Sequence, residues 1–140
     1  TSMTDGESCI EFQGFLFYFF NTASAGECGR YDLATTFVDA YFSVTPTGAA
    51  ALQIAPHPCA KKEDILGFGN GRYFGTFIFS TTTLAATKLD FGVTTEVADV
   101  AFHANQWWIA VNEGITTGTN RTHASLFLYD GAAISSILFD

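Results

Sequence analysis

The sequence predicts an all-β fold built from short antiparallel strands. Helical periodicity is scarce along its 140 residues, whereas aromatic and β-branched residues are abundant, with 15 Phe among them. Gly and Asn residues interrupt these apolar runs at short intervals, as turn residues do between strands. Some runs, such as residues 15–20, are apolar on both faces, and a strand of this kind needs cover on both sides. We therefore expect stacked sheets.

The expected strands follow one another along a single domain of residues 1–140. In order they are 9–14, 15–21, 36–44, 50–54, 71–80, 84–91, 97–103, 107–112, 124–129 and 134–139. Residues 55–64 contain Pro56, Pro58 and a charged quartet, and predict a linker or long loop, with a short helical turn at 60–65 as an alternative. The Gly- and Thr-rich residues 112–121 predict a long hairpin loop.

The charge of the chain argues against nucleic acid as a partner. The formal net charge is −8, from 14 acids against six bases, and phosphate binding needs clustered Lys and Arg. Charged residues make up only 14% of the chain, compared with about 25% in ordinary soluble domains. Such an apolar surface favours a protein partner, either further copies in a homo-oligomer or a larger assembly.

No membrane or secretion signal is visible. The longest apolar run, residues 15–20, falls short of the roughly 18 residues that a membrane helix needs. A basic region followed by an apolar one is also missing from the N-terminus, so no signal peptide is expected.

The cysteines and histidines predict no metal site and no cofactor. Cys9, Cys28 and Cys59 lack the close spacing of zinc ligands. Cys9 and Cys28 flank one predicted hairpin and could pair, although buried free thiols are the better interpretation. His57, His103 and His123 show no spacing typical of metal ligands either.

A repeated pattern divides the chain into three segments, at about 8–45, 63–97 and 98–140. Residues 64–74 resemble residues 99–109: in each, an acid precedes a short apolar strand, a turn at Asn70 or Asn105 and an aromatic-led strand. Residues 9–19 form a weaker third copy with a turn at Gly14. Asn and Gly suit such turns because they tolerate positive φ.

Acids at strand ends accompany these copies. Tyr31-Asp32, Leu89-Asp90 and Tyr129-Asp130 end apolar strands, and Gly92 and Gly131 follow the last two. Asp side chains accept backbone N–H groups in tight turns, so Asp90, Gly92, Asp130 and Gly131 are predicted turn residues. Asp90 and Asp130 are 40 residues apart, a spacing normal for one four-stranded propeller blade.

These motifs resemble those of Asp-box β-propellers, in which Ser-x-Asp-x-Gly-x-Thr precedes a Trp. Residues 88–94 keep Asp90, Gly92 and Thr94, but Lys88 replaces the Ser and Thr95 the Trp. The resemblance covers roughly residues 64–135 and implies antiparallel sheets in blade-like repeats, as in phage and bacterial propeller-type proteins. Three blades cannot close a ring, so chains would associate or the sheets would stay open. A β-sandwich or jelly roll is the alternative fold.

No catalytic constellation is recognisable, and we expect the chain not to be an enzyme. Some Asp-box proteins clamp a carboxylate with three arginines, but Arg30, Arg72 and Arg121 do not match those positions, and scattered surface arginines are the simpler interpretation. Neither a Gly-x-Ser-x-Gly elbow nor a phosphate-binding loop before a helix occurs.

The best binding candidates are aromatic. Trp107 and Trp108 would point to opposite faces of a strand, and indoles bind both sugars and proteins. Together with Asn112 and Arg121 they form the predicted glycan or interface site. We expect a structural or assembly module, plausibly a virion component (a phage decoration or tail-associated protein) or an extracellular one. A glycan-binding module and a fragment of a propeller-type glycoside hydrolase are the alternatives.

Overall fold

The computed structural model describes residues 3, 5–49, 56–114 and 123–138, and every regular element within them is a β-strand. The strands form three four-stranded antiparallel sheets, which confirms the predicted all-β fold. No helix that could cross a membrane is found in these residues.

Each sheet is a meander in which consecutive strands pair. The first sheet contains β1 (Asp5–Phe12), β2 (Phe15–Asn21), β3 (Gly26–Tyr31) and β4 (Phe37–Ser43). The second contains β5 (Cys59–Lys62), β6 (Ile65–Asn70), β7 (Tyr73–Ile78) and β8 (Thr83–Asp90). The third contains β9 (Thr95–His103), β10 (Gln106–Glu113), β11 (His123–Tyr129) and β12 (Ile134–Leu138).

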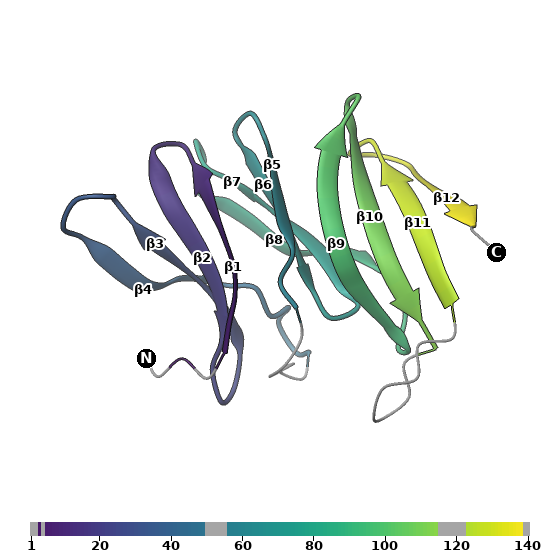
Figure 1. Ribbon diagram of the computed structural model, residues 1–140, viewed down its shortest axis with the longest axis horizontal. Coiled ribbons are helices and arrows are strands. Elements are labelled where there is room, and N and C mark those ends of the chain that lie inside the picture. Colours follow the sequence, from purple (N-terminus) through teal and green to yellow (C-terminus); the bar gives the residue numbers. More distant parts are fainter. Residues whose placement is uncertain (1–2, 4, 50–55, 115–122, 139–140) are drawn as a thin grey trace.

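The three sheets stand in a row, with the second sheet between the other two (Figure 1). The first strands of the sheets lie next to one another, because β5 contacts both β1 and β9. The fourth strands, β4, β8 and β12, form the opposite edges of their sheets.

Two apolar clusters hold the row together, one on each face of the second sheet. Phe17, Phe19 and Cys28 of the first sheet pack with Leu66, Phe68 and Phe77 of the second. On the other face, Phe74 packs with residues of the third sheet, namely Val97, Val100, Trp107, Ile109, Val111 and Tyr129. β6 serves both clusters, since its side chains alternate between the two faces.

Glycine in β6 makes room for the third sheet. A Cβ atom on Gly67 would lie 2.5 Å from Cζ3 of Trp107, and one on Gly69 would lie 2.8 Å from Cγ1 of Val97. Neither glycine has a left-handed φ, so it is this close approach that requires the missing side chain. The large residues of the third sheet enter the space that the glycines leave.

Two elements differ from the sequence-based expectation. The predicted linker at 55–64 contains β5, and the alternative of a helical turn at 60–65 is wrong, because Cys59–Lys62 pairs with β6 as the first strand of the second sheet. β3 was not predicted, since its sequence GECGRY has few strand-forming residues. The predicted strand at 50–54 and most of the predicted loop at 112–121 lie outside the described residues.

The sequence repeat does not pair equivalent strands. Residues 64–74 lie in β6 and β7, the second and third strands of their sheet, whereas residues 99–109 lie in β9 and β10, the first and second strands. The copy at 9–19 lies in β1 and β2, and so it corresponds to 99–109. In the second sheet, the turn that corresponds to those between β1 and β2 and between β9 and β10 is the one at Glu63-Asp64, between β5 and β6.

Candidate functional site

The two tryptophans lie on opposite faces of β10. Trp107 is 4% exposed and belongs to the cluster between the second and third sheets. It contacts Phe74 and Phe102 with ring centroids 5.5 and 4.9 Å apart. Trp108 is half-buried on the other side, and its Nε1 donates a hydrogen bond to the His103 carbonyl at 3.1 Å. Only Trp108 presents a surface to a partner.

Trp108 lies at the centre of a largely apolar face that points away from the second sheet. Strand register places Trp108 between Ala101 and Leu128. It places Ala110 between the exposed Asp99 and Leu126, and Leu126 pairs with Ile137. The inward positions between them belong to the buried cluster, so these residues point outward. We call this surface the Trp108 face: Ala101, Trp108, Ala110, Leu126, Leu128 and Ile137. It lies at one end of the row of sheets (Figure 1).

The opposite end of the row carries a similar surface on the first sheet. Phe17 and Phe19 point into the core, so the residues that alternate with them in β2 point outward. Register adds Tyr31, which pairs with Leu16 and Phe37. We call this surface the Tyr18 face: Leu16, Tyr18, Tyr31 and Phe37, with Phe20, which is only 1% exposed, packed against Tyr18. Its rings stack on one another, with centroids 5.6 Å apart for Tyr18 and Phe20 and 4.2 Å apart for Tyr31 and Phe37.

The ring of Tyr18 lies flat against the sheet. A Cβ atom on Gly29 would lie 2.1 Å from Cζ of Tyr18, so the ring covers this glycine directly. Phe37 is nevertheless 63% exposed. The Tyr18 face is therefore an aromatic surface on which Phe37 remains open to a partner, and it was not predicted from the sequence. Successive side chains of a strand point to opposite faces, so the apolar residues on either side of Phe17 were the signal that could have identified this face.

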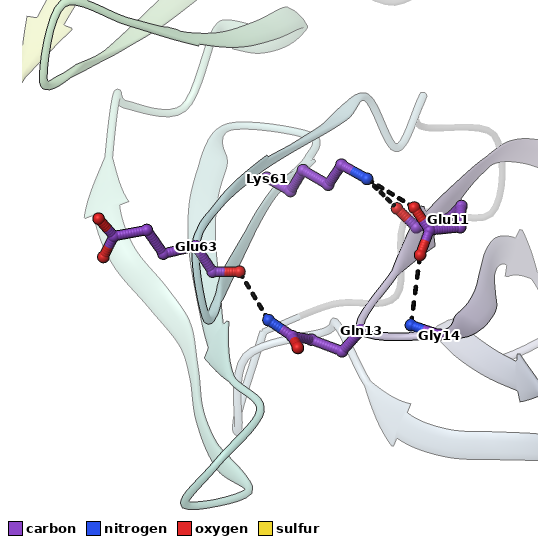
Figure 2. Close-up of polar contacts among 5 residues, drawn as sticks. All are labelled: Glu11, Gln13, Gly14, Lys61 and Glu63. Carbon is purple, nitrogen blue, oxygen red and sulfur yellow. Dashed lines mark hydrogen bonds and ion pairs between the residues drawn. The ribbon is translucent and has the colours of Figure 1, made fainter.

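Polar contacts fix the first sheet against the second where their first hairpins meet. Lys61 Nζ donates hydrogen bonds to Oε2 of Glu11 at 2.8 Å and to its carbonyl oxygen at 2.7 Å. Gln13 Nε2 donates to the Glu63 carbonyl oxygen at 2.8 Å (Figure 2). The hydrogen bond from Lys61 is the main reason that the pKa of Glu11 is lowered. These contacts link the two neighbouring hairpins at the surface.

His57 is buried between the same two sheets, at 1% exposure. Its Nε2 lies 2.8 Å from Oδ1 of Asn21 in β2, and its Nδ1 lies 3.0 Å from the carbonyl oxygen of Gly69 in β6. Burial lowers the pKa of His57, and the hydrogen bond with the Gly69 carbonyl opposes this effect. The ring therefore bridges the sheets as a structural group.

The predicted turn residues occupy two different kinds of turn. Asp130 follows β11, and its Oδ1 accepts hydrogen bonds from the backbone N–H groups of Ala132 and Ala133, which lower its pKa. Asp32 occupies the same place after β3, and three backbone N–H groups lower its pKa to about 2. Gly131 follows Asp130 with φ of 106°.

Asp90 lies instead at the end of β8, before the connection to the third sheet. Its Oδ1 accepts the Gly92 N–H at 3.0 Å, and its Oδ2 accepts a hydrogen bond from Arg72 at 2.9 Å. Gly92 has φ of 107°. The structural counterpart of Asp130 is thus Asp32. Asp90 and Asp130 lie in turns that are not equivalent, so the 40 residues between them are not the length of a structural repeat.

Of the remaining predicted polar residues, Asn112 lies on the same side of β10 as Trp108, because four residues separate them in the strand. Asn112 lies in β10, where its Nδ2 donates to Oε1 of Glu96 at 3.5 Å. Arg121 lies outside the described residues. The guanidinium of Arg30 stacks on Phe15 and Tyr41 at 4.4 and 4.3 Å, and Arg72 is held by Asp90. Both described arginines thus have structural partners.

The three cysteines are free thiols. Cys9 pairs with Tyr18 and points outward, whereas Cys28 pairs with Phe19 and lies in the core. The two are on opposite faces of the first sheet, so the alternative that they form a disulfide is wrong. Burial raises the pKa of the Cys28 thiol well above its ordinary value.

One surface groove, of about 480 Å³, lies between the first and second sheets near the end of β4. Its lining is small and neutral, with Thr45, Thr87 and Leu84 among the residues. No cluster of three or more potential metal ligands occurs in the residues that the structure describes. The groove offers little for recognition, and the two end faces are the better candidates.

Comparison of the chain with protein-family models, with curated proteins and with solved structures finds no match.

Proposed function

We propose that the chain is a non-enzymatic assembly module whose two end faces are covered by other protein subunits. The observation that carries this proposal is the apolar character of both end faces, with Phe37 63% and Ile137 38% exposed. Contiguous apolar surface of this kind marks interaction sites in soluble proteins. Aromatic residues such as Trp108 and Tyr18 are also those that dominate interface energies.

The same proposal includes a blade-like arrangement of the three sheets. Each sheet is a four-stranded meander, and the first strands β1, β5 and β9 lie next to one another, which are features of propeller blades. The turns at Asp32 and Asp130 are equivalent, since both join the third strand of a sheet to the fourth, and they give the first and third sheets the same plan. The proposal places this assembly in a virion, the setting that the resemblance to phage propeller-type proteins implies.

The roles of the charged groups support a structural function. Asp32, Asp90 and Asp130 organise turns, and Arg30 and Arg72 stabilise the fold through aromatic and acidic partners. Side chains engaged in this way are not poised as general acids, bases or carboxylate clamps.

Light scattering over a range of protein concentrations tests the proposal. We expect the chain to associate, and Trp108→Glu to weaken this association because it places a charge in an apolar interface. Val93→Glu is the matched control, since Val93 is 83% exposed in the connection between β8 and β9. A wild-type chain that stays monomeric up to its solubility limit would contradict the proposal.

Glycan binding is the second candidate, and the half-buried ring of Trp108 favours it. Indole faces stack on sugars, and Trp108 has an outward surface that Trp107 lacks. A glycan array decides between the two functions. A sugar signal that Trp108→Ala abolishes would support the second, whereas the absence of any signal leaves assembly as the proposed function.

A further inference from the structure

The two end faces are equivalent to faces that already pair inside the molecule. The first hairpin of each sheet turns at Gln13-Gly14, Glu63-Asp64 or Ala104-Asn105, and left-handed φ angles occur at Gln13, Glu63 and Ala104. Counting from these turns aligns the second strands β2, β6 and β10 residue by residue.

The aligned positions point the same way in every sheet. The second residue after the turn is Leu16, Leu66 or Trp107; Leu66 lies in the cluster with the first sheet and Trp107 in the cluster with the second. In the two later sheets this position thus faces the preceding sheet. In the first sheet it is Leu16, which lies on the Tyr18 face.

The third residue after the turn is Phe17, Gly67 or Trp108. Phe17 packs in the cluster with the second sheet, and Gly67 faces Trp107 of the third. In the two earlier sheets this position therefore faces the following sheet. In the third sheet it is Trp108. The Trp108 face is thus a forward face without a following sheet, and the Tyr18 face is a backward face without a preceding one.

The side chains on the two end faces also match the internal pairing. Between the first and second sheets, Phe17 at the third position after its turn packs in the same cluster as Leu66 at the second position after its turn. Two residues further along each strand, Phe19 contacts Phe68 with centroids 5.7 Å apart. The corresponding pairs across the two end faces are Trp108 with Leu16, and Ala110 with Tyr18. A large ring would again meet a leucine, and a small residue would face an aromatic ring.

We propose that two copies of this chain bind each other through these faces, with the Trp108 face of each copy on the Tyr18 face of the other. The inference rests on the proposed assembly function and names its partner. Interfaces between different faces close into rings when the rotation allows it. Propellers have about four to eight blades; one copy supplies three sheets and two supply six, whereas three copies would supply nine.

Two single-face variants and their mixture test this pairing. Trp108→Glu spoils one face and Leu16→Glu the other. Light scattering should give twice the 15.1 kDa chain mass for the wild type. Each variant alone should be a monomer, with association weakened by about 30-fold or more, as expected for central interface residues. The mixture keeps one intact pair of faces and should form a one-to-one complex. The control Val93→Glu should remain dimeric.

The possible failures are distinguishable. A single variant that still dimerises on its own, or a wild type with a mass other than twice the chain mass, would overturn the two-copy pairing and leave the assembly function standing. A monomeric wild type would overturn both. Urea unfolding of each variant verifies that it is folded, and Ala110→Glu replaces Trp108→Glu should the latter fail to fold.

Discussion

Trp107 and Trp108 are neighbours in one strand, yet they have different surroundings. Trp107 is covered by the second sheet, where Gly67 leaves space for its ring. Trp108 points to the end of the row, and its indole nitrogen bonds to the nearby His103 carbonyl. The difference shows that the burial of an aromatic residue in such a chain depends on the sheet that faces it.

The second and third sheets differ in the same way. The second is covered on both faces, by Leu66, Phe68 and their cluster on one side and by Phe74 with the third sheet on the other. The third sheet is apolar on both faces but has cover on one. If the end faces are binding surfaces, mutations at covered positions should change the stability of the fold, and mutations at end-face positions should change association instead.

Replacing each tryptophan in turn should give the largest contrast. Trp107→Ala removes a buried ring and should cost about 3–5 kcal/mol of the free energy of unfolding. Trp108→Ala should cost about 1 kcal/mol or less in the monomer, because its ring is packed on one side only. Urea unfolding in dilute solution measures both. Equal losses would mean that Trp108 is as well packed as Trp107 and would remove the contrast.

The glycine opposite Trp107 gives the next largest effect. In Gly67→Ala, the new Cβ meets the indole at 2.5 Å, and overpacking of this kind costs about 1–3 kcal/mol. Gly6→Ala is the control, since nothing lies within 4 Å of its added Cβ, and it should change stability by about 0.5 kcal/mol or less. Thermal or urea unfolding of the two variants compares them. A tolerated Gly67→Ala would show that the two sheets can move apart.

Acidification should weaken the covered side between the first and second sheets. The folded-state pKa of His57 lies below its ordinary value of 6.5 because the ring is buried. Above this value the ring is neutral in both states. As the pH falls below it, the unfolded chain binds a proton that the folded chain resists, so stability decreases by at most about 1.4 kcal/mol per pH unit.

His57→Gln should flatten this pH dependence between pH 6.5 and 5, and unfolding midpoints measured across that range provide the test. The variant is expected to be less stable at pH 7, since it loses the geometry of the hydrogen bonds with Asn21 and Gly69. An unchanged pH slope would mean that another group is responsible.

The smallest effect is expected at the turns of the two end sheets. Asp130→Ala removes the acceptor for two backbone N–H groups and should slightly lower the thermal midpoint at pH 7, whereas Asp130→Asn keeps an acceptor oxygen and should lower it less. The charge contributes above the ordinary pKa of 3.8 and is lost as the pH falls through the lowered folded value. In acid, wild type and Asp130→Asn should therefore converge, whereas Asp130→Ala should stay below both because it has no acceptor for these N–H groups.

Sequence patterns identified strands where they were long and apolar. Residues 15–21 were predicted with the bounds that β2 has in the structure, because six consecutive apolar residues have few alternatives. β5 was missed because its sequence CAKK follows two prolines and is polar. It is a strand because its backbone pairs with β6. The contacts of Lys61 with Glu11 and of Lys62 with the ring of Phe102 connect it to the neighbouring sheets.

The end faces were predicted only in part. Trp108 was singled out because tryptophan is conspicuous, but the Tyr18 face depends on which side of β2 meets the second sheet, and this is a tertiary property. The sequence repeat matched residues 64–74 with residues 99–109, which lie one strand earlier in their sheet, for a related reason. The β1–β2, β6–β7 and β9–β10 hairpins each have an apolar strand after a small or polar turn, so strand pairs at different places in their sheets look alike in sequence.

The position of its only two tryptophans, side by side on opposite faces of β10, also makes the chain a natural fluorescent probe. In Trp108→Phe, emission would come from the enclosed indole and would follow denaturation of the core. In Trp107→Phe, it would come from the outward indole, and a blue shift or protection from acrylamide quenching would register the arrival of a neighbouring molecule.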